Sequence, residues 1–138
     1  MIKMSFDLTL FNTGMIKLRG AAIEGSCAGV TRAIERLKDD ALNKYPACPY
    51  DTGWMSEHHQ TRVYTRRNTT YGVLAVVDTP YAASLHEGIS RWGTPYRYKT
   101  PGTGMKWIES KVLMYRNIYV EDMRQEIKTR IKARFMRK

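Results

Sequence analysis

The chain has 138 residues and a mass of 16.0 kDa, which is enough for one compact domain and too little for two ordinary ones. Hydrophobic residues make up 43% and charged residues 26%, a composition that excludes a disordered tail and an integral membrane protein. The 23 Lys and Arg outnumber the 13 Asp and Glu, so the formal net charge is +10. Such a surplus predicts an acidic partner, whether nucleic acid, anionic lipid or the acidic face of a protein.

The N-terminal segment and the cysteines point to a cytosolic protein. No run reaches the roughly 18 apolar residues of a membrane-spanning helix, and Asp7 interrupts the apolar stretch where a signal peptide would be sought. Cys27 and Cys48 are too few for a disulfide framework, and no CxxC pair suggests a zinc or redox site. We therefore expect no cofactor and no membrane partner.

The apolar pattern predicts an α+β fold, with helices towards both ends of a single domain, 1–138. Residues 1–10 are expected to form an N-terminal arm or strand. A long amphipathic helix is expected over 11–45, because apolar residues recur at steps of three and four, and Pro46 with Pro49 ends it. The apolar face of this helix comprises Ile23, Cys27, Val30, Ile34, Leu37 and Ala41.

The middle of the chain predicts an antiparallel β-hairpin over 57–79, where the apolar period changes to two and Arg67-Asn68-Thr69 supplies the turn. Residues 81–87 are expected to add one or two helical turns. Residues 89–104 contain three Gly and two Pro without periodicity, and are expected to form an extended loop that is functional or ordered on assembly. Helical spacing returns over 105–136, as one helix or as a pair broken at Asn117.

Two sets of side chains are candidates for contact with another protein chain. One is an apolar stripe at every fourth residue near the C-terminus, which drifts around a helix and so cannot all face one small core. The other is the aromatic and basic part of the loop, because Trp, Tyr and Arg dominate the energy of protein interfaces. These candidate interface residues are Arg91, Trp92, Tyr96, Tyr98, Met123, Ile127, Ile131 and Phe135.

Basic residues of the hairpin and the loop are candidate contacts to nucleic acid or to an acidic partner. They are Arg62, Arg66, Arg67, Arg97 and Lys99. Cations interleaved with aromatic rings bind a nucleic-acid strand through phosphate pairing and base stacking, and they equally anchor a protein interface. No helix-turn-helix, RRM or zinc-finger pattern favours the first of these.

Short motifs that suggest catalysis or metal binding lack the context that the chemistry needs. Asp51-Thr52-Gly53 matches the catalytic loop of retroviral-type aspartic proteases, in which two such loops meet across a dimer, but no flap hairpin and no second apolar catalytic strand accompany it. His58 and His59 would point to opposite faces of a strand, and no zinc-ligand spacing includes them. We expect no catalytic residue and no metal site.

Two segments, Pro49-Tyr50-Asp51-Thr52-Gly53-Trp54-Met55 after the first helix and Tyr81-Ala82-Ala83-Ser84-Leu85-His86-Glu87-Gly88 after the hairpin, carry a family resemblance. They are similar to the "P-x-DTG-x-L/M" and "YA-x-x-x-E-x-G" patterns of the neck proteins of long-tailed bacteriophages, which are called minor capsid, head-tail joining or tail-completion proteins. The matched positions are Pro49, Asp51, Thr52, Gly53, Met55, Tyr81, Ala82, Glu87 and Gly88. Two departures are Trp54, where the family often has a small or apolar residue, and Gly104-Met105-Lys106-Trp107 in place of a "Pro-x-Pro-Phe" entry to the last helix.

The resemblance implies a structural virion protein rather than an enzyme. It implies a homo-oligomeric ring, expected to be a hexamer, assembled in the host cytoplasm at the head-tail junction beside neck, connector or tail-tube proteins, with double-stranded DNA passing through its channel. A stand-alone basic nucleic-acid-binding module is the alternative, and an aspartic protease using Asp51 is a remote third. Under the first hypothesis most of the positive charge faces acidic neighbouring rings, because a lumen that held phosphates tightly would retard the DNA.

Overall fold

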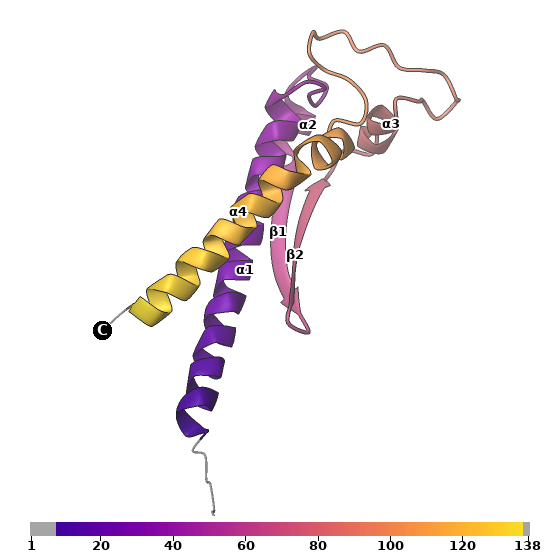
Figure 1. Cartoon of the computed structure of the whole chain (residues 1–138). Coiled ribbons are helices and arrows are strands. Elements are labelled where there is room, and N and C mark those ends of the chain that lie inside the picture. The colour runs from indigo at the N-terminus through magenta and orange to yellow at the C-terminus, as the bar shows by residue number, and fades with distance from the viewer. Residues whose placement is uncertain (1–7, 137–138) are drawn as a thin grey trace, which may run out of the picture.

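The computed structural model describes residues 8–136 and is an α+β structure. Its elements in chain order are α1 (Thr9–Asn43), α2 (Trp54–Glu57), β1 (His59–Arg66), β2 (Thr69–Val76), α3 (Ala82–Glu87) and α4 (Glu109–Met136). The long helices α1 and α4 cross each other, the hairpin lies along α1, and α2, α3 and the loop after α3 gather at one end of the molecule (Figure 1).

Helix α1 begins earlier than the sequence predicts. Most of the arm or strand expected over 1–10 lies outside the described residues, but Thr9 and Leu10 are already helical, so the prediction is wrong for those two. The helix ends at Asn43, where the N–H of Lys44 donates to the carbonyl of Asp40 at 2.9 Å. The helix thus ends two residues before the predicted bound at 45, and three before Pro46, which agrees with the expectation that proline stops it.

The predicted apolar face of α1 covers the hairpin and part of the core. Its last three members, Ile34, Leu37 and Ala41, are buried, and its first three are half-buried. Gly72 of β2 lies so close to this face that a Cβ atom there would be 2.9 Å from a Val30 methyl carbon. The face therefore holds the sheet on the helix, as an amphipathic helix should.

A second buried face of α1, made of small residues, packs against α4. It comprises Ala21, Gly25, Gly29 and Ala33. A Cβ atom on Gly25 would be 2.7 Å from Ile127 Cα, and one on Gly29 would be 2.8 Å from Met123 Cα. Both contacts are with backbone atoms of α4. A side chain at Gly25 or Gly29 would therefore push the two helices apart, and the glycines allow their close approach.

The hairpin and α4 refine two further predictions. The strands pair antiparallel from His59 with Val76 to Arg66 with Thr69, within the predicted range 57–79. Positive φ angles at Arg67 (48°) and Asn68 (63°) give the two-residue turn a backbone conformation that suits the twist of a hairpin.

Helix α4 is a single helix with no break at Asn117. It begins at Glu109 rather than at 105, because residues 105–108 form turns.

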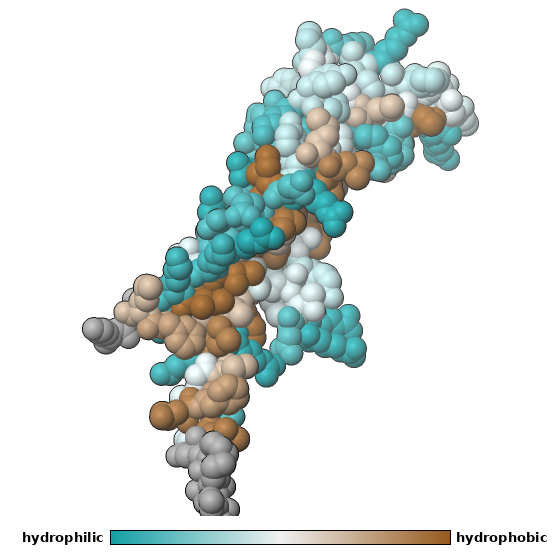
Figure 2. Space-filling view, in the orientation of Figure 1, coloured by the Kyte–Doolittle hydropathy of each residue, from teal (hydrophilic) through white to brown (hydrophobic). Residues whose placement is uncertain are grey.

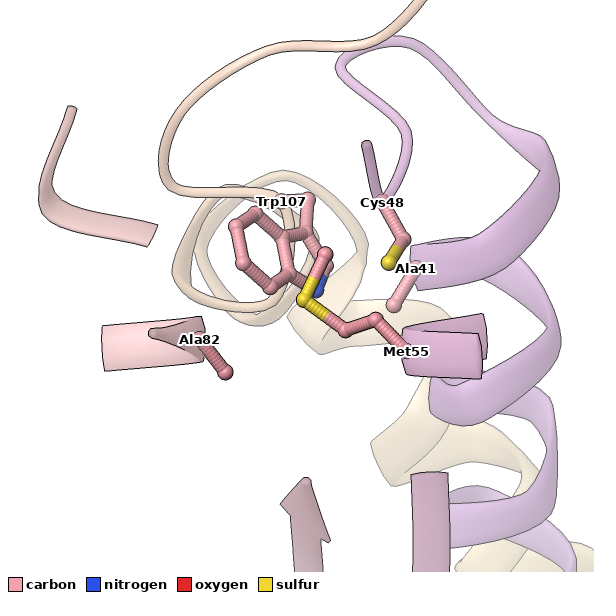
Figure 3. Close-up of a cluster of buried hydrophobic side chains, with 5 residues drawn as sticks. All are labelled: Ala41, Cys48, Met55, Ala82 and Trp107. Carbon is pink, nitrogen blue, oxygen red and sulfur yellow. The ribbon is translucent and has the colours of Figure 1, made fainter. Parts of the chain in front are cut away.

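Two apolar clusters form the core. The lower one lies between α1, the hairpin and α4 and contains Ala33, Ile34, Leu37 and Tyr119. The upper one lies under α2, α3 and the start of α4, and Figure 3 shows its members around the Trp107 ring, namely Ala41, Cys48, Met55, Ala82 and Trp107.

Buried polar groups near these clusters have partners. The Tyr119 hydroxyl donates to Asp40 Oδ2 at 2.8 Å, and burial raises the pKa of that phenol. The ammonium group of Lys111, a fully buried residue, donates to the carbonyl of Pro46 at 2.7 Å and to Ser110 Oγ at 3.2 Å. Burial lowers the pKa of Lys111, since the charged form loses its water.

Candidate functional site

A buried histidine–tryptophan pair lies behind Met55, a residue that also lines the candidate site. Trp107 and His59 are 0% and 1% exposed, and the indole Nε1–H of Trp107 donates to His59 Nε2 at 3.2 Å. An indole N–H can only donate, so His59 Nε2 is the acceptor and the ring proton sits on Nδ1, which donates to the carbonyl of Met55 at 2.8 Å. Burial lowers the pKa of His59, which keeps the imidazole neutral in this arrangement.

Beside this pair, three segments that are distant in sequence enclose a groove of about 520 Å³. They are residues 49–55, which include the first two residues of α2; Tyr81 with Leu85 of α3; and residues 96–100 with Thr103 in the second half of the loop. We call it the aromatic groove, because five of its lining residues carry aromatic rings: Tyr50, Trp54, Tyr81, Tyr96 and Tyr98. The other lining residues are Pro49, Asp51, Thr52, Gly53, Met55, Leu85, Arg97, Lys99, Thr100 and Thr103.

The first sequence motif forms one wall of the groove, and its backbone geometry accounts for its glycine. Gly53 has a φ of +85°, a left-handed conformation that L side chains rarely adopt, and a Cβ there would lie 3.3 Å from the Tyr50 ring. Asp51 is exposed. Among the described residues that line the groove it is the single acid, so one copy of this part of the chain does not assemble the carboxylate pair of an aspartic protease.

The second motif is mainly structural. Ala82 is buried in the upper cluster, and of this segment Tyr81 and Leu85 line the groove. Glu87 accepts a salt bridge from Lys106 Nζ at 2.7 Å, which with His86 lowers the pKa of that carboxyl. Gly88 caps α3 with a φ of +76°, and a Cβ on it would meet the Met105 sulfur at 2.7 Å.

The loop brings four of the predicted residues to the groove and leaves two outside. Tyr96, Arg97, Tyr98 and Lys99 line it. Trp92 is 85% exposed, with the Arg91 guanidinium 5.6 Å from the centre of its ring. Both lie apart from the groove, in the half of the loop closer to α3.

The remaining candidates lie elsewhere. Met123 and Ile127 pack on the small-residue face of α1, so within this chain they contact α1. Ile131 is half-buried, and Phe135 is 52% exposed. The basic residues of the hairpin, Arg62, Arg66 and Arg67, are exposed, and the turn that carries the last of them lies at the end of the hairpin opposite the loop (Figure 1).

Sequence reasoning did not select several residues of the site. The sequence marks Trp54 only as a departure from the family pattern, although its side chain is 49% exposed in the groove and stacks on His58 with ring centres 4.0 Å apart. The histidine–tryptophan pair joins positions 48 residues apart, and no local pattern encodes such a contact. The signal that the sequence does carry is a tryptophan directly after Asp51-Thr52-Gly53, since turns lie at the surface.

No protein-family model, no curated protein and no solved structure matches this chain. Among residues 8–136, no helix is long and apolar enough to cross a membrane. Within that same range, no group of three or more His, Cys, Asp or Glu side chains is placed to hold a metal ion.

Proposed function

We propose that the protein is a structural subunit of the bacteriophage neck, a ring-forming head-tail joining or tail-completion protein in the virion. The ring is expected to be a hexamer through which double-stranded DNA passes. The two motifs that resemble the family support the proposal. The observation that carries it is the first third of α1, which extends beyond the body of the molecule with large apolar side chains exposed.

This extension is apolar along much of its surface. Leu10 is 85% exposed, Ile16 73% and Phe11 63%. Figure 1 shows this part of α1 running past both α4 and the hairpin turn, and Figure 2 shows hydrophobic residues along it. Exposed apolar surface of this size on a projecting helix marks contact with another molecule.

The arrangement suits a ring, because ring closure needs two different patches that meet head to tail. The apolar extension of α1 lies at one end of the molecule, and the loop with its exposed Trp92 lies at the other (Figure 1). A subunit of this shape can offer one patch to each neighbour. A symmetric dimer would instead pair a patch with itself.

Sedimentation and negative-stain imaging of the purified chain, alone and with phage tails, test the proposal. The pair Phe11→Ser and Ile16→Ser should abolish assembly. The matched control, Asn12→Ser and Lys17→Ser, introduces the same residue type on the same turns of α1 and should leave assembly intact. A wild-type chain that stays monomeric, joins neither tails nor heads and binds duplex DNA with a steep salt dependence would contradict the neck assignment and support the nucleic-acid-binding alternative.

A further inference from the structure

The segment 96–100 forms one wall of the aromatic groove and is anchored by its inward side chains. Its burial alternates: Tyr96, Tyr98 and Thr100 are half-buried, whereas Arg97 and Lys99 are exposed. The Tyr98 hydroxyl donates to the carbonyl of Leu85, and Thr100 Oγ1 donates to the carbonyl of Tyr50 at 2.8 Å. An alternation of period two is that of an extended chain, with Arg97 and Lys99 on one side.

The backbone of this segment offers hydrogen-bonding groups to a partner. Within residues 8–136, the N–H and C=O groups of Arg97, Tyr98 and Lys99 make no hydrogen bond. Each flank of the stretch is fixed, since the N–H of Tyr96 donates to the carbonyl of Gly88 at 3.0 Å and the carbonyl of Thr100 accepts from Thr103. An anchored, extended and unpaired backbone is a template for an added strand.

The charge on this wall favours an acidic strand. No acidic residue occurs between Glu87 and Glu109, and Arg97 and Lys99 form no salt bridge with any described carboxylate. On paired strands, opposite residues lie side by side on the same face. Two carboxylates spaced two residues apart on the incoming strand would therefore each meet one of these cations.

We propose that the aromatic groove binds an extended acidic peptide segment of a partner protein. The segment adds as a strand to the backbone of residues 97–99, its alternate carboxylates pair with Arg97 and Lys99, and its other side chains contact Tyr50 and Tyr81 across the groove. This inference rests on the proposed function in treating the chain as an assembly protein, and it adds the chemistry of what the groove receives.

The same observations favour a peptide over a nucleic-acid strand. Unpaired backbone N–H and C=O groups match another polypeptide backbone, whereas phosphates offer no donor in return. One face of Trp54 is already covered by His58, which leaves less of it for base stacking.

Fluorescence anisotropy tests the proposal with a fluorescein-labelled peptide in which glutamate alternates with threonine and valine. The comparison probes are the same peptide with lysine for glutamate and a single-stranded oligodeoxythymidine. The test variant is Arg97→Glu with Lys99→Glu, and its matched control is Arg91→Glu, which changes an exposed cation of the same loop outside the groove. Circular dichroism confirms that each variant is folded.

We expect the wild-type chain to bind the glutamate peptide, the double variant to bind it about tenfold more weakly or worse, and the control to bind within about twofold of wild type. Bound peptide should slow hydrogen exchange at the amides of 97–99. The proposal is overturned if the wild-type chain does not bind, if the lysine peptide or the oligonucleotide binds as tightly, if the double variant binds normally, or if exchange at these amides is unchanged. If the chain assembles but does not bind the peptide, only the peptide-binding inference is refuted. If the chain stays monomeric but binds the peptide, only the proposed ring is refuted.

Discussion

The substitution Gly29→Ala isolates the contact that joins the two long helices. An alanine Cβ at this position would lie 2.8 Å from Met123 Cα and 3.0 Å from its carbonyl oxygen. Carbon atoms at rest lie about 3.5–4.0 Å apart, so the helices would have to separate by roughly 1 Å. Backbone cannot move aside as a flexible side chain can, so the strain is shared along the whole small-residue face.

The expected net effect is a loss of about 1–2 kcal/mol in the free energy of unfolding. It combines a gain of about 1 kcal/mol from replacing glycine inside a helix with an overpacking cost in the upper part of the 1–3 kcal/mol range. Urea denaturation followed by the helical circular dichroism signal measures it, at a concentration where sedimentation shows one species.

Gly20→Ala is the matched control, because a Cβ at Gly20 would have no neighbour within 4 Å. The same change in the same helix should therefore stabilise the protein by about 0.5–1 kcal/mol. If Gly29→Ala is as stable as Gly20→Ala, the close approach of α1 and α4 does not depend on the missing side chain, and the reasoning fails.

Three further predictions concern the buried polar groups. Burial lowers the pKa of His59, so as the pH falls the histidine is protonated in the unfolded state before it is protonated in the folded state. The free energy of unfolding should therefore decrease as the pH drops below about 6.5. Urea midpoints measured across this pH range should decrease less for His59→Phe than for the wild type. Burial raises the pKa of Cys48 to about 12, so a thiol reagent should modify half-buried Cys27 quickly and Cys48 only on unfolding, and equal rates in the native protein would contradict the assigned burial. Tyr119→Phe leaves Asp40 Oδ2 without its 2.8 Å donor and should cost about 1.5–3 kcal/mol in urea titrations, whereas an unchanged midpoint would mean that the bond contributes nothing.

Local sequence patterns were enough to predict the long helices and the hairpin, but not the contacts between these elements. The steps of three and four from Ile23 to Ala41 predict a helix because burial of one face repeats with the helical turn. The glycines that face α4 carry no hydropathy signal, since what they contribute is the absence of a side chain, and this makes sense only once a second helix lies against them. Helix α2 has four residues, too few for any periodicity to register.

The candidate site was predictable in its parts and not in its assembly. The Asp-Thr-Gly turn and the aromatic, basic loop were each selected from sequence, but nothing local indicates that residues 49–55 and 96–103 share one groove. One contact that joins them is the hydrogen bond from Thr100 Oγ1 to the carbonyl of Tyr50, a tertiary contact between positions 50 residues apart. The same limit applies to Met123 and Ile127, which looked like surplus apolar residues because their cover, the small-residue face of α1, is invisible to a count of large hydrophobic residues.

The distribution of the charge surplus bears on the proposed function. Carboxylates of α1 and α4 already form salt bridges within the chain: Asp122 pairs with Arg32 and Arg36, and Asp40 pairs with Lys44. The cations that make no salt bridge among the described residues include those of the hairpin, the loop and the end of α4, namely Arg62, Arg66, Arg67, Arg91, Arg97, Lys99, Lys128, Arg130 and Lys132. The surplus is thus spread over three regions rather than gathered into one groove, which is how a subunit that meets several acidic neighbours would carry it. A single nucleic-acid strand would need a continuous positive path instead, and the turn of the hairpin and the loop lie at opposite ends of the hairpin (Figure 1).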